Sequence, residues 1–193
     1  MVERNYSKTI KKTSFTLIET LITISVIALL AGAGIVIFSR YRARTNLTFA
    51  LQQLADDLKK TRSMGIMTID NAGNIPEGGY GIFLSLSNGC PPRDSDSYIL
   101  FADNDGDRKY DDPVEMIEKI KVPYGVEIKE LKKGDGTPLQ CLQVIFVPPE
   151  PTIIVKGKTT TISVGEVVFR VKGLPCPEYC KSLKVYDSGK IEY

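Results

Sequence analysis

The sequence contains no histidine and no tryptophan. Without histidine the chain cannot form Ser-His-Asp or Cys-His catalytic sites or histidine-ligated zinc, and it lacks the usual general base near neutral pH. A phosphate-binding glycine loop and a dinucleotide-binding glycine motif are also missing, and the carboxylates form no recognisable catalytic pattern. We therefore expect a protein that is not an enzyme and that uses no cofactor.

An excess of charge is also lacking outside the first fourteen residues. The 193 residues carry 25 Lys and Arg against 23 Asp and Glu, a net charge of +2. Residues 1–14 alone have a net charge of +3, so the remaining chain has a net charge of −1. Phosphate contacts need clustered cations, so binding to nucleic acid is not expected.

A long apolar segment without proline extends from Phe15 to Phe38, and its only charged residue is Glu19. As a helix it would span roughly 36 Å, enough for a bilayer core of about 30 Å. It is longer than the apolar part of a secretory signal, and Ala31–Gly34 is a weak cleavage site. The segment predicts a transmembrane helix, in which Glu19 is hydrated at the interface or paired with a cation.

The leader and the start of this segment form an ordered motif, Ser14-Phe15-Thr16-Leu17-Ile18-Glu19. It resembles the processing site of type IV prepilins and type II secretion pseudopilins, with Ser14 where that family usually has Gly. The resemblance implies that a prepilin peptidase cuts between Ser14 and Phe15 and methylates the new amine of Phe15. It further implies that Glu19 pairs with this amine of a neighbouring subunit, in a filament of several pilins built by an assembly platform and a motor.

Helical periodicity continues beyond the apolar segment, because Leu47, Leu51, Leu54 and Leu58 recur at spacings of four, three and four. This stripe predicts the core-facing side of a helix, and it is too short to argue for a coiled coil. We divide the chain into a cytoplasmic leader (1–14), a transmembrane or filament-core helix (15–38), an amphipathic second half of that helix (39–66) and a β domain (67–193).

From Gly65 onward, alternating apolar residues and turn sequences replace the helical pattern. Nine strands are predicted, at Tyr80–Leu86, Ser97–Ala102, Glu115–Val122, Val126–Leu131, Leu142–Val147, Thr152–Val155, Glu166–Lys172, Leu183–Tyr186 and Lys190–Tyr193. Strands that follow one another without helices predict an antiparallel sheet. The expected fold is therefore α+β, with a long N-terminal helix, its first half transmembrane, packed on an antiparallel β-sheet; the resemblance implies that this fold is pilin-like.

Two further stretches, LFADNDGDRKYDDPVEMIEKIKVPYGVEI and the ending EVVFRVKG with VYDSGKIEY, resemble pseudopilin H and the FimT-type minor pilins. This resemblance implies a minor pseudopilin-like subunit of a type II secretion or type IV pilus filament. It would be a single-pass protein of the bacterial cytoplasmic membrane with its C-terminal domain outside the cytoplasm. The alternative is a FimT-like minor pilin that binds DNA for uptake, although Gly189-Lys190-Ile191-Glu192 stands where that subfamily has Gly-Arg-x-Arg.

Four cysteines, Cys90, Cys141, Cys176 and Cys180, form an even set without a Cys-x-x-Cys pair. In a domain outside the cytoplasm they predict two disulfides, which three connectivities allow. We favour Cys90–Cys141 with Cys176–Cys180, and a zinc site or free thiols remain as alternatives.

Aspartates are concentrated between residues 103 and 112. Asp103, Asp105 and Asp107 alternate as hard oxygen ligands do in calcium loops, but Gly106 and Val114 occupy the wrong positions for the standard loop. A calcium site at these three residues is one hypothesis. An Asp/Gly-rich turn, in which short polar side chains bind their own backbone, is the other.

Overall fold

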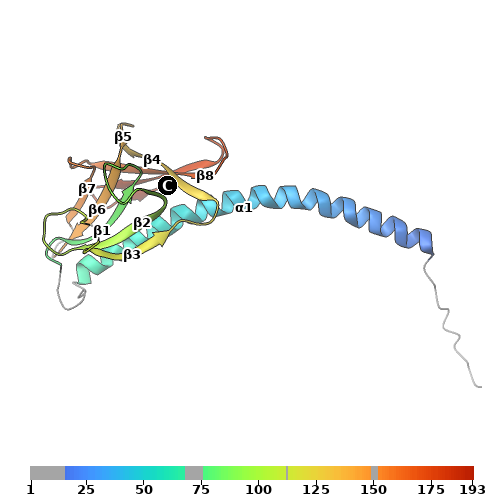
Figure 1. The fold of residues 1–193 in the computed structure, drawn as a ribbon, viewed down its shortest axis with the longest axis horizontal. Coiled ribbons are helices and arrows are strands. Elements are labelled where there is room, and N and C mark those ends of the chain that lie inside the picture. Colours follow the sequence, from blue (N-terminus) through green and yellow to red (C-terminus); the bar gives the residue numbers. More distant parts are fainter. Residues whose placement is uncertain (1–15, 68–75, 112, 149–151) are drawn as a thin grey trace, which may run out of the picture. The chain divides into compact units, whose positions relative to one another are not determined.

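A computed structural model describes residues 16–67, 76–111, 113–148 and 152–193. Within the helix α1 (Leu17–Met67) it describes side chains at 17–32, 38 and 41–67. The chain divides into two compact units, Met1–Arg40 and Tyr41–Tyr193. Figure 1 shows α1 in blue to teal, followed by strands in green to red.

In the first unit, α1 carries exposed apolar side chains over residues 17–32. Among the residues that the structure describes, no helix is long and apolar enough to cross a membrane. The transmembrane first half that the sequence predicted is therefore corrected.

The second unit contains two five-stranded antiparallel sheets where the sequence predicted one. The first sheet has the order β3-β2-β1-β6-β7, with β1 (Gly79–Ser85), β2 (Asp94–Asp103), β3 (Met116–Lys121), β6 (Cys141–Val147) and β7 (Thr152–Lys156). The second has the order β10-β9-β8-β4-β5, with β4 (Val126–Lys133), β5 (Pro138–Leu139), β8 (Val164–Val171), β9 (Cys180–Tyr186) and β10 (Ile191–Glu192).

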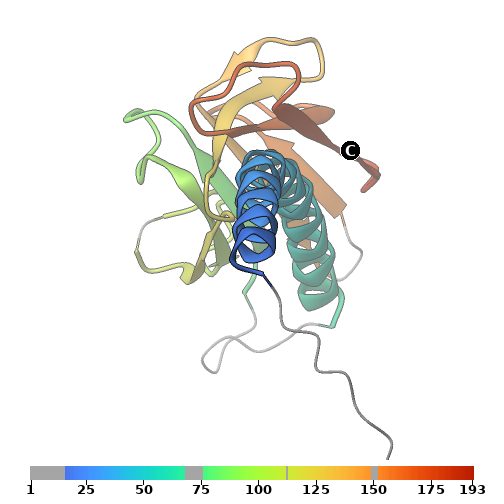
Figure 2. The same cartoon turned by 90° about the vertical axis from the view of Figure 1, so that its right-hand side faces the viewer.

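The leucine stripe of α1 forms the centre of the core in the second unit. Leu47, Leu51, Leu54 and Leu58 are fully buried together with side chains from both sheets, such as Leu142 in the first and Phe169 in the second. Figure 2 shows the teal segment of α1 lying against the strands. The stripe is therefore confirmed as core-facing, but the arrangement expected for the whole fold is wrong. Within the second unit, residues 41–67 of α1 pack on two sheets, whereas the sequence predicted that one long helix packs on one sheet.

A second apolar cluster includes Phe83, Phe101, Tyr110 and Ile145, together with the disulfide partners Cys90 and Cys141. The rings of Phe83 and Tyr110 lie 4.9 Å apart between centroids. Every residue of β1 is buried, which shows that the middle of the first sheet is covered on both faces. Through Cys90 and Tyr110, this cluster attaches the segment around Cys90 and the aspartate-rich loop to the first sheet.

Candidate functional site

The residues of the prepilin-like motif are described in part. Ser14 and Phe15 lie outside the described residues, whereas Thr16 and Glu19 form the start of α1. The Glu19 amide donates hydrogen bonds to the carbonyl oxygen of Thr16 at 3.1 Å and to its Oγ1 at 3.3 Å, so Thr16 is an N-cap. Glu19 is exposed in the first helical turn, where an anion also interacts favourably with the helix dipole.

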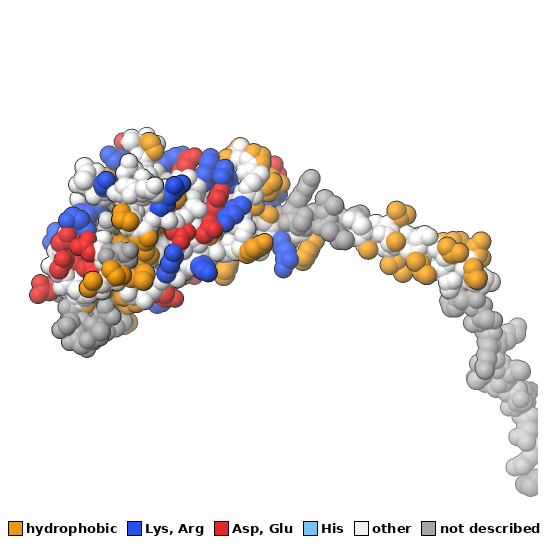
Figure 3. Space-filling model, in the orientation of Figure 1, with side chains coloured by type: hydrophobic (Ala, Val, Ile, Leu, Met, Phe, Trp, Pro, Cys, Tyr) orange, Lys and Arg blue, Asp and Glu red, His pale blue; other side chains and the backbone are white. Residues whose placement is uncertain are grey.

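Large apolar side chains surround the first turns of α1 on both sides of Glu19 in the sequence, and we call this set the apolar sleeve. Its members are between 49% and 79% exposed: Leu17, Ile18, Leu21, Ile22, Ile24, Val26, Ile27, Leu29 and Leu30. Figure 3 shows orange side chains along this part of the helix. A continuous apolar surface of this kind is typical of a region that binds other apolar surfaces.

The aspartate-rich loop follows β2, and two fully buried carboxylates organise its backbone. The Asp103 carboxylate accepts hydrogen bonds from the amides of Gly106 (2.8 Å) and Arg108 (2.7 Å). The Glu115 carboxylate accepts them from the amides of Asn104 (3.0 Å) and Asp111 (2.9 Å). Each of the four carboxylate oxygens therefore already has a backbone donor, which favours the turn interpretation over a calcium loop.

Carboxylates of the same loop still approach one another closely enough to share a cation. One group contains Asp103, Asp105 and Glu115, and a second contains Asp105, Asp107 and Asp111, with ligand atoms within 4.8 Å of each other in each group. The structure thus separates Asp103 from Asp107, which the sequence placed in one site. The structure adds Glu115 to the first group. Sequence reasoning missed Glu115, although this residue directly follows Val114, which occupies a ligand position of the standard calcium loop.

Within this loop, burial and ion pairing shift the pKa values of the carboxyl groups in opposite directions. Loss of water raises the pKa of Asp103 and of Glu115, and neighbouring carboxylates such as Asp105 add to the rise. Asp107 instead forms an ion pair with Lys109 at 2.7 Å, and the hydrogen bond in this pair lowers the pKa of Asp107. The buried pair Asp103 and Glu115 is therefore the part of the loop at which a divalent cation or a proton would relieve repulsion.

Both disulfides have the connectivity that we favoured from the sequence. Cys90–Cys141 joins the segment after β1 to the start of β6, and both cysteines are buried, at 7% and 1% exposure. Cys176–Cys180 closes a short loop at the start of β9, where Cys176 is exposed. No cysteine is free, so neither a zinc site nor free thiols are found.

The short loop closed by Cys176–Cys180 contacts α1 through a set that we call the helix clamp: Arg44, Glu178 and Tyr179. The Arg44 guanidinium forms an ion pair with Glu178, and its Cζ lies 5.7 Å from the centroid of the Tyr179 ring. Lys181, one residue beyond the loop, donates to Thr48 Oγ1 at 3.0 Å. Sequence reasoning missed this clamp, because nothing in the spacing of Arg44 and Glu178 indicates that they meet.

The position that carries Gly-Arg-x-Arg in FimT-type pilins, residues 189–192, begins in the turn after β9 and ends in β10. The Lys190 ammonium forms an ion pair with Glu192 and lies 5.7 Å from the centroid of the Tyr186 ring. Glu192 also accepts a hydrogen bond from the Tyr186 hydroxyl at 2.7 Å. A cation already paired in this way does not favour phosphate binding, so the geometry gives no support to the DNA-binding alternative.

The described residues thus offer one surface for association, the apolar sleeve with Glu19, and one loop with buried acid groups. No protein-family model, curated protein or solved structure matches this chain.

Proposed function

We propose that this chain is a minor pseudopilin-like structural subunit of a type II secretion or type IV pilus filament. The observation that carries the proposal is the apolar sleeve, which begins directly at the prepilin-like motif. Exposed apolar surface is unfavourable in water, so the sleeve needs a covering surface. In a filament, the equivalent helices of neighbouring subunits supply that surface.

Glu19 supplies the specificity that an apolar surface alone does not. It is the single charged residue between Phe15 and Phe38, and it lies exposed at the start of the sleeve. Cleavage after Ser14 would create an amine at Phe15, and a neighbouring subunit could place this amine beside Glu19. An ion pair in a dry interface is several times stronger than in water and penalises any register that leaves the charge unpaired.

The partners follow from this assembly: a prepilin peptidase, sister pilins, an assembly platform and a motor. Two disulfides in the second unit support a position of this unit outside the cytoplasm, since disulfides persist in oxidising compartments.

The test is co-expression of the full chain with a prepilin peptidase and the sister pilins of one filament system. We expect the mature N-terminus to be Phe15. Glu19→Val should still be cleaved, but its incorporation into filaments should fall roughly tenfold or more, as loss of about 1.4 kcal/mol or more requires. The matched control is Thr23→Val, which changes an exposed residue one turn further along α1 and should assemble normally.

Two results would overturn the proposal. One is an N-terminus at Met1 or a cut near Ala31–Gly34. The other is equal incorporation of Glu19→Val and Thr23→Val, which would reduce Glu19 to an anion that stabilises the first helical turn.

A further inference from the structure

The two disulfides differ in their access to solvent. Cys90 and Cys141 are buried in the cluster beneath the first sheet. Cys176 is exposed and Cys180 half-buried, and both line a surface pocket of about 270 Å³ between β4, β8 and β9. A reagent in solution can therefore reach the second pair while the first is protected.

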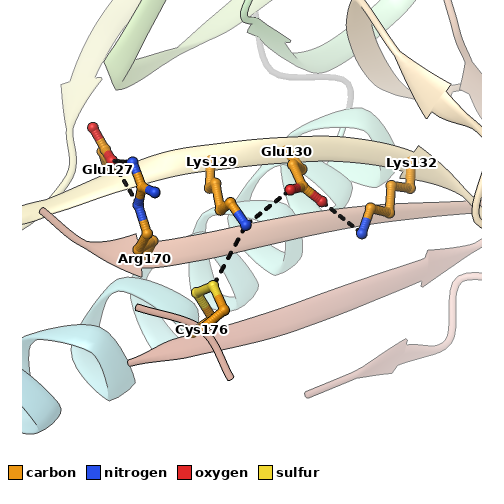
Figure 4. The surroundings of a disulfide bond; sticks show 7 residues. Glu127, Lys129, Glu130, Lys132, Arg170 and Cys176 are labelled. Atoms are coloured by element: carbon orange, nitrogen blue, oxygen red, sulfur yellow. Dashed lines mark hydrogen bonds and ion pairs between the residues drawn. A yellow bond between two sulfur atoms is a disulfide. The ribbon is translucent and has the colours of Figure 1, made fainter. Parts of the chain in front are cut away.

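A positive charge lies beside one sulfur of the accessible pair. The Lys129 ammonium is 3.6 Å from Cys176 Sγ, and a dashed line joins the two side chains in Figure 4. Lys129 also pairs with Glu130 at 3.0 Å, but Lys132 pairs with the same carboxylate at 2.6 Å. These three side chains together carry a charge of +1. The other charged groups that line the pocket, Lys181 and Glu166, have opposite signs.

This asymmetry distinguishes the two sulfurs chemically. A thiolate is a better leaving group when its pKa is low, and an adjacent ammonium lowers a thiol pKa by stabilising the anion. Cys176 has such a neighbour at its sulfur, whereas no ammonium among the described residues makes a contact of this kind with Cys180. Exposed disulfides are also the ones that exchange most readily with thiols.

We propose that Cys176–Cys180 is a site of reversible thiol–disulfide exchange, open to a dithiol reductant. One thiolate of the dithiol attacks Cys180 Sγ and forms a mixed disulfide. The bond between the two cysteine sulfurs breaks, and its electron pair leaves on Cys176 as a thiolate beside Lys129. The second thiolate of the dithiol then attacks the other sulfur of the same dithiol molecule, which is bonded to Cys180. This attack breaks the mixed disulfide and releases Cys180 as a thiolate.

The overall step is balanced. The dithiol loses two electrons and becomes a disulfide, while the cysteine pair gains them, and the two thiol protons of the dithiol pass through solvent to Cys176 and Cys180. Reoxidation by a disulfide reagent follows the same path in reverse.

Exchange at this site would act on the contact between the second unit's helix segment and its second sheet. Glu178 and Tyr179 lie within the ring that the disulfide closes, and they form the helix clamp with Arg44. Opening the ring frees the backbone of this loop, so the clamp residues lose the constraint that holds them against Arg44. The redox state of one surface pair is thereby coupled to a contact of α1.

The test uses the full chain, dithiothreitol as the dithiol probe, and timed alkylation followed by peptide mapping. We expect Cys176–Cys180 to be reduced at least about tenfold faster than Cys90–Cys141. Lys129→Met should slow this reduction about threefold, since loss of the ammonium removes a charge that stabilises the departing thiolate, and a less stable thiolate leaves more slowly. Lys129→Arg should restore the rate. Lys133→Met, on the same strand but outside the pocket, is the matched control and should leave it unchanged.

Protection of Cys90–Cys141 in each variant reports that the domain is still folded. Equal reduction rates for the two disulfides in the folded chain would overturn the proposal. So would equal rates for Lys129→Met and Lys133→Met. With reduced glutathione as a monothiol probe, an adduct at Cys180 supports the assignment of Cys176 as leaving group, and an adduct at Cys176 contradicts it.

Discussion

Single polar side chains connect α1 to the first sheet. Tyr98 on β2 is almost completely buried, and its hydroxyl donates a hydrogen bond to the Asp57 carboxylate on α1. The Gln53 amide donates to the carbonyl oxygen of Lys121 at 3.0 Å, at the end of β3. Burial raises the pKa of Tyr98, so its hydroxyl keeps its proton and remains a donor across the physiological pH range.

Removing the Tyr98 hydroxyl should weaken the attachment of α1. For Tyr98→Phe we expect the free energy of unfolding to fall by about 1–3 kcal/mol, because the ring still fills its place but the bond to a charged acceptor is lost. Urea denaturation followed by circular dichroism measures this change. Tyr124→Phe is the control, since the Tyr124 side chain is 96% exposed and its replacement should change stability by less than about 0.5 kcal/mol. Equal stability of both variants would show that the Tyr98–Asp57 bond contributes nothing net.

The aspartate-rich loop is the element whose stability depends most clearly on protons. Asp103 and Glu115 have raised pKa values in the folded state, so between the ordinary carboxyl pKa of about 4 and these raised values the folded chain binds more protons than the unfolded chain. The free energy of unfolding therefore falls as pH rises through this window. Asp94 and Asp107 have lowered pKa values, and their stabilisation is lost only below about pH 4.

We accordingly expect the free energy of unfolding to fall as the pH rises from about 4 through the raised pKa values of Asp103 and Glu115. Glu115→Gln should flatten this dependence by up to about 1.4 kcal/mol per pH unit, the limit for one proton. Urea unfolding at a series of pH values tests it, with Glu166→Gln on β8 as the control. If Glu115→Gln kept the full pH dependence of the free energy of unfolding, the prediction would be wrong, and groups other than Glu115 would bind the protons.

At the scale of the elements, local residue patterns predicted the strands better than their assembly. All nine predicted strands are present with small shifts at their ends, because alternation of apolar residues and turn sequences such as Ser188-Gly189 act locally. Strand β5 escaped prediction, since Pro138 and Leu139 are too few to show a period. The division into two sheets was missed because β1 pairs with β6, more than fifty residues away, and no local pattern records that partner.

The candidate sites show the same limit. The short cysteine spacing made Cys176–Cys180 a natural pair, and only one partner then remained for Cys90. The contacts of Glu115 and of the helix clamp form only because the folded chain brings separated residues together. The spacing of these residues in the sequence therefore did not reveal them. Ser14 and Phe15 lie outside the described residues, and their processing remains a prediction.

At the scale of the whole molecule, the core and the association surface belong to different units. Among the described residues, the buried core lies within residues 41–193, whereas the apolar sleeve lies within the first forty residues. Folding of the second unit therefore does not require the surface that we assign to assembly.

This separation predicts how truncation acts. A chain beginning at residue 41 should be soluble, monomeric in sedimentation analysis and cooperative in urea unfolding, because it keeps the leucine stripe and loses the sleeve. A chain beginning at residue 62 is the matched control, and it should fail to fold, because it also lacks Leu47, Leu51, Leu54 and Leu58. Association of the longer fragment would place an assembly surface on the second unit.

The outer strands of the second sheet, β5 and β10, have only two residues each. In the first sheet, the outer strand β3 carries Lys119 and Lys121. A long, uncharged outer strand presents unpaired amides and carbonyls that recruit strands from other molecules, and crowding many copies together increases that hazard. Outer strands this short, and lysines on an outer strand, discourage such cross-β aggregation, so crowded copies of the second unit are less prone to join along these three edges.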